Sequence, residues 1–485
     1  MKKNDTFITE CIGYNIDGFG VVRIDDFVVF VPGLIKGEVA EIGITALKKS
    51  YGYGRIIEIK ETSKHRVKPM CDVYPRCGGC QLQHMDYEAQ KQLKEEIVKD
   101  CFKQNAHMDI TPLPILTSQK QEAYRNKVQV PAQYKDGSLK MGFYRSRSND
   151  IVEYDICKIQ SDLSNAIIST CKKLFQKLEI SKDIRHVLVK HAHSNGEVMV
   201  CLVSRSYPLK NQEKLVQLLC KNHPEIQSIT LIHNQRNDNV ILDGKEHLLF
   251  GKPYIEEQLM GKTFMIHAKS FFQINPYTTP LLYGKAIEYA NLSKNDIAID
   301  LYCGTGTIGL LMADKVKKVY GIEIVADAIK DAKKNAINNH IDNIEFLNMD
   351  ALQGAKALIR SKIKADVIIV DPPRKGCTKD TIQAMKQINP KRIVYVSCNP
   401  ATLARDVKEL SDAYTLEEIQ PVDMFPQTTH IECVTVLRRK TDKDSTESLL
   451  IGEYETFEEQ FEFKVNEDNT RDISRKKRVK TRIMI

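Results

Sequence analysis

The first 60 residues alternate short apolar, β-branched runs with glycines. Short strands separated by turn residues at regular spacing predict a small β-barrel of about five strands. The expected strands cover residues 7–16, 20–24, 27–31, 38–46 and 55–59. The stretches 17–20 and 51–54, which combine glycine with aromatic residues, are expected to be loops. Small barrels with aromatic and basic loops often bind single-stranded nucleic acid.

Residues 61–85 have no clear period, whereas residues 86–265 mix helical and strand periods and predict a central α+β domain. Its helices are expected at 87–105, 162–177 and 211–222, and its strands at 124–134, 141–144, 184–193, 197–204, 228–234 and 240–249. In the first helix, the lysines are expected to face mostly outward: Lys91, Lys94, Lys99 and Lys103. The loop Arg145-Ser146-Arg147-Ser148 fits phosphate binding and solvated surface equally well.

Within residues 266–440, helices and strands alternate regularly. This pattern predicts a doubly wound α/β sheet with an antiparallel strand at its end. The expected strands are 297–301, 318–322, 344–348, 365–370, 392–396, 414–422 and 431–438, and the helices are 276–290, 307–313, 326–340, 352–361, 379–388 and 400–411. Because the strand 392–396 stops at Ser397-Cys398-Asn399-Pro400, Cys398 should lie at a carboxyl strand end, where such sheets bind ligands.

The chain has 485 residues, of which 42% are hydrophobic and 28% charged. This composition is typical of a soluble protein of about two to four domains. No apolar run reaches the ~18–20 residues of a membrane span, and no signal peptide is visible, so we expect a cytoplasmic protein that does not enter membranes. The net charge of +8 suits a polyanionic partner or an ordinary basic surface. Residues 441–485 carry an acidic block and then a basic block, which predicts a disordered tail.

A glycine loop, Asp300 to Gly309, joins a predicted strand to a helix. Gly304 and Gly306 would let the backbone approach a ligand, and Glu323, at the end of the next strand, is placed to accept hydrogen bonds from ribose hydroxyls. These features suit a dinucleotide or S-adenosylmethionine. Two further acidic strand ends favour S-adenosylmethionine: Asn348-Met349-Asp350, suited to an adenine amine, and Asp371-Pro372-Pro373-Arg374, which would face the methyl group.

Two long motifs make the interpretation specific. The first comprises Asp371-Pro372-Pro373-Arg374-Lys375-Gly376 and Tyr395-Val396-Ser397-Cys398-Asn399-Pro400-Ala401-Thr402, and the second runs from Val422 to Glu432. Together they resemble the signatures of RNA 5-methyluridine methyltransferases. The resemblance implies a Rossmann-like class I methyltransferase domain, a TRAM domain as the N-terminal OB-like barrel, and a central RNA-binding domain. It also implies that Gln273, Tyr302, Glu323 and Asp371 contact the cofactor.

Uracil C5 is a poor nucleophile, so a thiolate that adds to C6 is needed to activate it. The resemblance assigns this nucleophile to Cys398, and it assigns removal of the C5 proton to Glu432. A neighbouring positive charge or the start of the helix at Pro400 would favour the thiolate. The target uridine must be splayed or flipped out of folded RNA to reach such a site.

Cys71, Cys77 and Cys80 are closely spaced around Gly78-Gly79, which suggests a metal or cluster site in the segment 61–85. Spacing leaves the fourth ligand open among Cys101, Cys157, Cys171 and others, and four thiolates suit either zinc or an iron–sulfur cluster. The resemblance to one subfamily selects Cys157 and a [4Fe-4S] cluster. Because methyl transfer needs no electrons, the expected role is structural or in positioning RNA.

The barrel and the cysteines resemble the branch that acts on 23S rRNA, so this RNA is the expected partner of a monomer with no protein partner. A tRNA uridine is the second possibility. An amine N-methyltransferase could use the Asp-Pro-Pro motif but needs neither Cys398 nor Glu432. A non-catalytic RNA-binding assembly factor would not need an intact glycine loop, Cys398 or Glu432.

Overall fold

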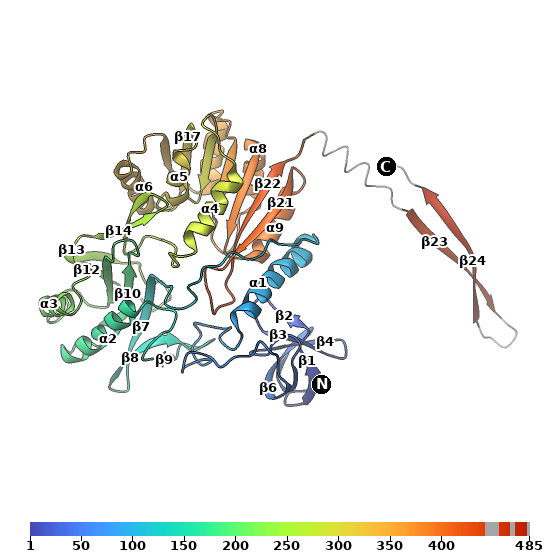
Figure 1. Ribbon diagram of the computed structural model, residues 1–485, viewed down its shortest axis with the longest axis horizontal. Coiled ribbons are helices and arrows are strands. Elements are labelled where there is room, and N and C mark those ends of the chain that lie inside the picture. The colour runs from blue at the N-terminus through green and yellow to red at the C-terminus, as the bar shows by residue number, and fades with distance from the viewer. Residues whose placement is uncertain (442–454, 466–470, 483–485) are drawn as a thin grey trace.

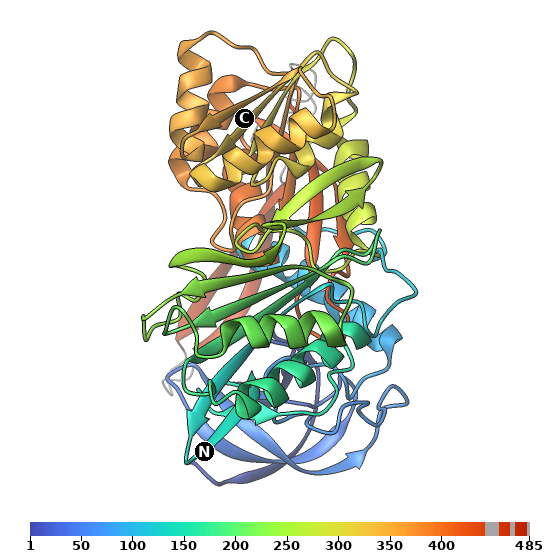
Figure 2. The ribbon, with the colours of Figure 1, turned by 90° about the vertical axis from the view of Figure 1, so that its left-hand side faces the viewer.

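The computed structural model describes residues 1–441, 455–465 and 471–482. Three domains follow one another along the chain, and in Figure 1 the barrel and the central domain lie side by side below the C-terminal domain. Figure 2 shows the N-terminal barrel at one end, the central domain in the middle and the C-terminal α/β domain at the other end. No helix among the described residues is long and apolar enough to cross a membrane.

The N-terminal domain is a six-stranded sheet in the order β1-β5-β6-β4-β3-β2. Its strands are β1 (Thr6–Glu10), β2 (Gly13–Tyr14), β3 (Gly20–Ile24), β4 (Phe27–Val31), β5 (Val39–Leu47) and β6 (Tyr51–Glu61). The expectation of a loop at 51–54 was wrong, because these residues begin β6. Gly52 instead permits close packing, since a Cβ there would lie 3.1 Å from the Leu47 side chain.

Helix α1 (Tyr87–Cys101) continues into the π-helical turn η1 (Phe102–Ala106), which confirms the predicted helix. The Asp86 carboxylate caps α1 by accepting a hydrogen bond from the Ala89 amide at 2.8 Å. The outward placement of Lys94 was wrong: this side chain is fully buried, and its Nζ lies 2.6 Å from Asp423 Oδ1. A distant loop covers this side of α1, so helical period alone could not reveal the burial.

The central domain contains a seven-stranded sheet in the order β13-β12-β11-β10-β7-β8-β9. Its strands are β7 (Lys127–Lys135), β8 (Ser138–Tyr144), β9 (Ile151–Glu153), β10 (Ile184–His191), β11 (Val198–Ser204), β12 (Ile226–His233) and β13 (Lys245–Gly251). Helices α2 (Asp162–Lys177) and α3 (Gln212–Asn222) bury apolar residues in the same core as the sheet. The separate hairpin β14 (Tyr254–Leu259) and β15 (Lys262–His267) was not predicted.

The C-terminal domain has a second seven-stranded sheet, in the order β18-β17-β16-β19-β20-β22-β21. Its strands are β16 (Ile297–Leu301), β17 (Lys318–Glu323), β18 (Ile344–Asn348), β19 (Val367–Val370), β20 (Arg392–Ser397), β21 (Tyr414–Val422) and β22 (Glu432–Arg439). Its helices are α4 (Thr279–Ala290), α5 (Thr307–Ala313), α6 (Ala326–Asn338), α7 (Ala351–Arg360), α8 (Lys379–Ile388) and α9 (Pro400–Leu410). These bounds agree closely with the predicted alternation.

Strands β16 to β20 are parallel, and β22 runs antiparallel to both β20 and β21. The winding direction reverses between β16 and β19, and a ligand is expected at the carboxyl ends of such a pair. Helices α7, α8 and α9 share one core with the sheet, and α4, α5 and α6 share the other. Val98 and Phe102 from α1 and η1 belong to the first core, so the start of the central segment packs on the C-terminal domain.

In the tail, β23 (Glu455–Val465) and β24 (Arg471–Arg482) pair antiparallel. Figure 1 shows this hairpin apart from the three domains. The structure therefore differs from the expected disorder over these two segments, where an acidic stretch pairs with a basic one. The rest of that prediction falls on residues 442–454, 466–470 and 483–485, which lie outside the described residues.

Candidate active site and cysteine-lined cavity

The glycine loop connects β16 to α5. Gly304 and Gly306 have φ angles of 55° and 82°, a region that glycine adopts without strain. At Gly306 a Cβ would lie 3.1 Å from the Phe346 ring, whereas at Gly304 it would meet nothing within 4 Å. Gly306 thus permits close packing, and Gly304 leaves open space beside the loop.

Asp300 lies under this loop and is buried. Its Oδ2 accepts a hydrogen bond from the Gly309 amide at 2.7 Å, while its Oδ1 has no hydrogen-bond partner in the described part of the chain. Burial, with a smaller contribution from Asp371 and Glu323, raises the pKa of Asp300 to about 8. An unpaired buried oxygen is uncommon in a folded protein and marks a place where a polar partner would be favourable.

Glu323 ends β17 as predicted. Its two oxygens accept hydrogen bonds from the amides of Gly304 at 3.1 Å and Val325 at 2.9 Å. The next residue, Ile324, is 66% exposed, and Met349, which follows β18, is 40% exposed. Sequence reasoning missed Ile324 as a candidate; the signal was an apolar residue directly after an acidic strand end. These two side chains can cover an apolar face of a ligand bound at Glu323.

Three other predicted cofactor residues lie in different surroundings. Asp350 is exposed and caps α7, accepting from the Gln353 amide at 3.0 Å. Gln273 is buried, and its side chain hydrogen-bonds to Tyr283, a buried tyrosine whose pKa is raised mainly by burial. The Tyr302 hydroxyl instead hydrogen-bonds to Cys377 and Thr381 beside the start of α8. The structure therefore gives the Tyr302 hydroxyl partners on α8 and its preceding loop.

Cys398 is half-buried at the carboxyl end of β20. The following Asn399 caps α9, its Oδ1 accepting from the Ala401 amide at 3.1 Å. Burial raises the pKa of the Cys398 thiol to about 11, with Glu432 and Asp371 adding to this effect. A hydrogen bond and the positive charge of Arg374 act in the opposite direction. The expected lowering of the thiol pKa is thus outweighed in the protein alone.

Glu432 begins β22 and is buried. The antiparallel ladder of β20 and β22 ends at the pair Ser397 and Cys433, so Cys398 and Glu432 both adjoin the last pair of this ladder. Burial raises the pKa of Glu432 well above its usual value, and Asp371 adds to the shift. Burial also raises the pKa of Asp371, directly after β19, to about 7. One thiol and two carboxyls therefore meet at adjacent strand ends.

Arg374 connects these groups, and sequence reasoning gave it no role. Its carbonyl oxygen accepts hydrogen bonds from Asn399 Nδ2 at 3.1 Å and Thr402 Oγ1 at 3.2 Å. Its Nη2 lies 2.7 Å from His430 Nδ1. Desolvation, with the Arg374 cation, lowers the pKa of His430 to about 4, so the neutral ring can accept this hydrogen bond. The signal available in the sequence was the position of Arg374, a cation that follows Asp371 in the Asp-Pro-Pro-Arg motif.

The loop between β21 and β22 carries His430 and is held by helix α1. Asp423 Oδ1 accepts from buried Lys94 at 2.6 Å, and its Oδ2 accepts from the Tyr87 hydroxyl at 2.9 Å. Gln90 and Gln427 exchange two hydrogen bonds of 3.0 Å. Removing one partner of a buried ion pair typically destabilises a protein by ~3–5 kcal/mol. The loop that leads to Glu432 is thus fixed by residues of helix α1, which comes much earlier in the chain.

The four predicted metal ligands come together. Cys71, Cys77, Cys80 and Cys157 line one cavity of about 250 Å³, together with Arg125, Tyr154, His430 and others. Burial raises the pKa of Cys80 to about 12 and also raises those of Cys77 and Cys157. Among the described residues, no group of three or more His, Cys, Asp or Glu side chains is arranged to hold a single metal ion.

The two alternative fourth ligands lie elsewhere. Cys101 packs in the small core that includes Leu82 and Leu93, and Cys171 is fully buried in the core of the central domain. The cavity is therefore lined by the cysteine set that the sequence resemblance selected, rather than by these buried thiols.

The glycine loop, the acidic strand ends and the strand-end thiol define the class of S-adenosylmethionine-dependent methyltransferases. Residues 86–440 match the family described as tRNA (Uracil-5-)-methyltransferase, and residues 10–57 match the TRAM domain. The chain belongs to the tRNA (uracil-5-)-methyltransferase family. It is an S-adenosylmethionine-dependent RNA (uracil-C5)-methyltransferase.

Similar proteins extend over almost the whole chain. An uncharacterized RNA methyltransferase of Oceanobacillus iheyensis is 41% identical over 451 residues, covering 91% of this chain and 98% of the relative. One of Staphylococcus aureus strain MW2 is 40% identical over 450 residues, covering 91% and 99%. The crystal structure of Pyrococcus abyssi tRNA (uracil-54, C5)-methyltransferase with S-adenosyl-L-homocysteine has a TM-score of 0.70 and 27% identity, covering 89% of this chain and 100% of the other.

Proposed function

We propose that the protein methylates C5 of a uridine in 23S rRNA through a covalent bond between Cys398 and uracil C6. The observation that supports the mechanism is that Cys398 and buried Glu432 both lie at the end of the β20–β22 ladder, close enough for the Glu432 carboxyl to raise the pKa of the thiol. The reaction needs a thiol nucleophile that adds to C6 and a carboxylate base that removes the C5 proton, both close to the same uracil ring.

S-adenosylmethionine supplies the methyl group on a sulfonium. The residues proposed to hold it form one set: Gln273, Tyr302, Gly304, Gly306, Glu323, Asp350 and Asp371. The fit is electrostatic, because Asp300, Glu323, Asp371 and Glu432 are carboxylic side chains around the strand ends, and the cofactor carries a sulfonium and an ammonium. The open space beside Gly304, next to Glu323, supports a ligand at this place. Tyr302 would contribute through its ring or backbone, since its hydroxyl is engaged at Cys377 and Thr381.

In this mechanism the Cys398 thiol loses its proton to solvent, and Arg374 stabilises the thiolate that forms. The thiolate adds to C6, and the electron pair of the C5–C6 bond becomes an enolate that is nucleophilic at C5. C5 then forms a bond to the methyl carbon while the sulfonium–methyl bond breaks, which leaves S-adenosylhomocysteine. Glu432 accepts the C5 proton, and elimination breaks the sulfur–C6 bond, which restores the thiolate and the aromatic uracil. Because burial makes an ionised Glu432 more basic than an exposed carboxylate, it suits the proton-removal step.

The direct test of the mechanism uses RNA containing 5-fluorouridine at the target position. Fluorine cannot leave as a proton does, so methylation should stop at a protein–RNA adduct that survives a denaturing gel. Absence of an adduct, from protein that methylates ordinary RNA, would overturn the covalent mechanism.

The choice of 23S rRNA is supported by the barrel together with the cysteine-lined cavity. A tRNA uridine is the second candidate, favoured by the Pyrococcus abyssi tRNA enzyme, whose chain is covered completely. Nucleoside mass spectrometry after incubation with purified 23S rRNA or tRNA separates them. We expect 5-methyluridine in the rRNA; product in tRNA alone would select the second candidate, and product in neither would contradict both.

We also propose that Cys71, Cys77, Cys80 and Cys157 hold a [4Fe-4S] cluster with a structural role. The four cysteines line one cavity of about 250 Å³, and the resemblance of the sequence favours an iron–sulfur cluster over zinc. Iron and sulfide analysis of protein purified without oxygen tests this. Stoichiometric zinc without iron would contradict the cluster.

A further inference from the structure

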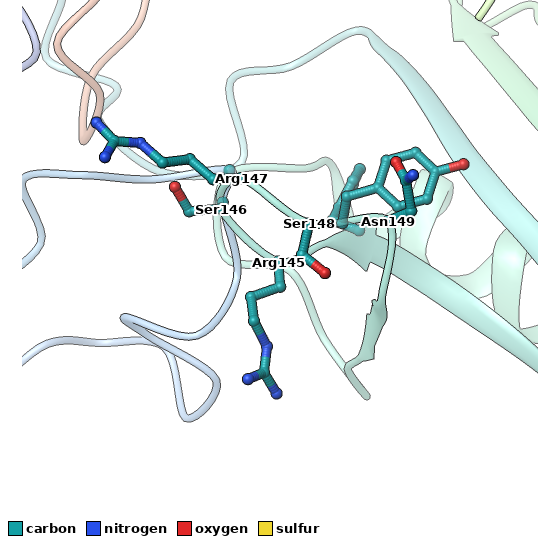
Figure 3. A pocket seen from close by; sticks show the side chains of 9 residues that line it. Arg145, Ser146, Arg147, Ser148 and Asn149 are labelled. Atoms are coloured by element: carbon teal, nitrogen blue, oxygen red, sulfur yellow. The ribbon is translucent and has the colours of Figure 1, made fainter. Parts of the chain in front are cut away.

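An open pocket of about 630 Å³ lies where the turn between β8 and β9 meets the cysteine-containing segment. It is lined by Gly78, Gly79, Phe143, Tyr144, Arg145, Ser146, Arg147, Ser148 and Asn149. Figure 3 shows Arg145 and Arg147 leaving the same turn in different directions. The lining offers two guanidinium groups, three hydroxyls and one amide, and no carboxylate belongs to it. This chemistry suits an anion.

The turn is held in a defined shape. The Arg145 amide donates to the Asp150 carbonyl at 2.8 Å, and the Ser148 amide donates to the Arg145 carbonyl at 3.1 Å. Beneath it, the Gly78 amide donates to the Tyr144 carbonyl at 3.0 Å. A Cβ on Gly78 would lie only 3.0 Å from that carbonyl oxygen, so the backbone approach requires glycine. The pocket is therefore formed before any ligand binds.

The two arginines have different neighbours. The Arg147 guanidinium lies 5.5 Å from the Phe19 ring centre and 5.3 Å from that of Tyr53, which ties the turn to the barrel. Arg145 is exposed, and in the part of the chain that the structure describes no acidic side chain forms an ion pair with it. Arg145 is thus the cation left available for a ligand, and Arg147 helps to fix the pocket against the barrel.

The pocket also continues toward the proposed active site. It shares Gly78, Gly79 and Phe143 with the cysteine-lined cavity, and that cavity includes His430. His430 hydrogen-bonds to Arg374, whose positive charge acts on Cys398. The open pocket is therefore a neighbour of the cysteine-lined cavity, and that cavity reaches the loop next to the proposed active site.

We propose that this pocket binds the phosphodiester backbone of the RNA strand that flanks the target uridine, with Arg145 as the main phosphate contact. The proposal rests on the proposed RNA substrate and adds a site that positions the strand. Phosphate contacts fix the register of a nucleic acid without reading its bases. The pocket should therefore raise affinity for single-stranded RNA of any sequence.

The test measures binding of the full-length protein to a fluorescent single-stranded RNA over a range of KCl concentrations. We expect Arg145→Ala to weaken binding about fivefold and Arg145→Glu by more than about tenfold at moderate salt. Loss of one phosphate contact should also reduce the slope of log K against log salt by about 0.7–1. Arg145→Lys should retain the slope. Arg360→Ala, which removes an exposed arginine from α7, should match the unchanged protein.

S-adenosylmethionine binding and kcat at saturating RNA should stay unchanged in Arg145→Ala, while KM for RNA rises. Affinity within twofold of the unchanged protein, with the same salt slope, would overturn the proposal; so would weaker binding with an unaltered slope. These results are distinct from a failure of the proposed function, in which the unchanged protein would methylate neither rRNA nor tRNA whatever residue 145 contributes to RNA affinity.

Discussion

Two groups of thiols in this molecule have similar acidity and different surroundings. Burial raises the pKa of Cys398 to about 11 and that of Cys80 to about 12. Cys398 is the thiol beside two carboxyls and one arginine, whereas Cys80 shares its cavity with three other thiols. The raised pKa therefore does not distinguish a nucleophile from a ligand; the chemical identity of the neighbours does.

The two groups are also held differently. Cys398 follows a strand that is paired on both sides, by β19 and β22. The four cysteines of the cavity lie outside strands and helices. Hydrogen bonds hold their backbone: the Cys71 amide donates to Gln83 Oε1 at 3.1 Å, and the Cys157 amide donates to Asn165 Oδ1 at 3.0 Å. The first site is formed by the sheet itself. The second would gain most of its rigidity from a bound group, since such binding stabilises the folded state.

The largest effect is expected from Cys398→Ala. Loss of the nucleophile should lower methylation by at least about 10⁴-fold and abolish the 5-fluorouridine adduct. Nucleoside mass spectrometry and a denaturing gel measure the two results. Cys220→Ala, which removes a half-buried thiol from α3, serves as the control and should keep both activities. Full activity of Cys398→Ala would place the nucleophile elsewhere.

Replacing the proposed base should have the next largest effect. Glu432→Gln retains the size and polarity of the buried side chain but cannot accept the C5 proton, so turnover should fall by about 10²–10⁴-fold. Because elimination would stall after methyl transfer, an adduct with ordinary RNA should accumulate and be visible on a denaturing gel. Rapid release of methylated RNA by this variant would remove Glu432 from the role of base.

A smaller effect, on iron content and stability, is expected from a substitution in the cysteine-lined cavity. Cys80→Ser should lower bound iron and sulfide and reduce the melting temperature by about 5 °C, because one ligand of a stabilising group is lost. Binding of S-adenosylmethionine should be unchanged, since the glycine loop belongs to the C-terminal domain and Cys80 does not. Cys220→Ser is the matched control. Equal iron content in Cys80→Ser and the unchanged protein would exclude Cys80 as a ligand.

The sequence predicted the C-terminal sheet better than its surroundings. Strands β16 and β18 and helix α5 have the expected bounds because regular α/β alternation is a local signal. Lys94 was assigned to the outside because its partner, Asp423, is 329 residues away in the chain. Contacts between distant segments do not appear in a local period.

The candidate site shows the same division. The motifs identified Cys398 and Glu432 as candidates, and the structure adds that both adjoin the last pair of the β20–β22 ladder. The link from Arg374 to His430 could not be predicted, because it depends on where the loop before β22 folds. The direction of the Tyr302 hydroxyl likewise depends on packing against α8, which the glycine motif does not encode.

The smallest effect expected is a pH dependence of cofactor binding, which would sharpen the contrast between a carboxylate-lined and a thiol-lined site. Burial raises the pKa of Asp371 to about 7 and that of Asp300 to about 8 in the protein alone. A cationic ligand favours the ionised carboxylates, so binding must release protons when the pH is below these values. Affinity for S-adenosylmethionine should therefore rise by up to about tenfold from pH 5.5 to 7.5, a range in which the ligand's ammonium, with a pKa of about 7.7–8.0 for an α-amino group, stays largely protonated.

Titration calorimetry in two buffers of different ionisation enthalpy measures both affinity and released protons. Asp371→Asn should reduce the proton release, and Cys80→Ser should not; a pH-independent affinity with no proton release would show that the ligand does not pair with these carboxyls.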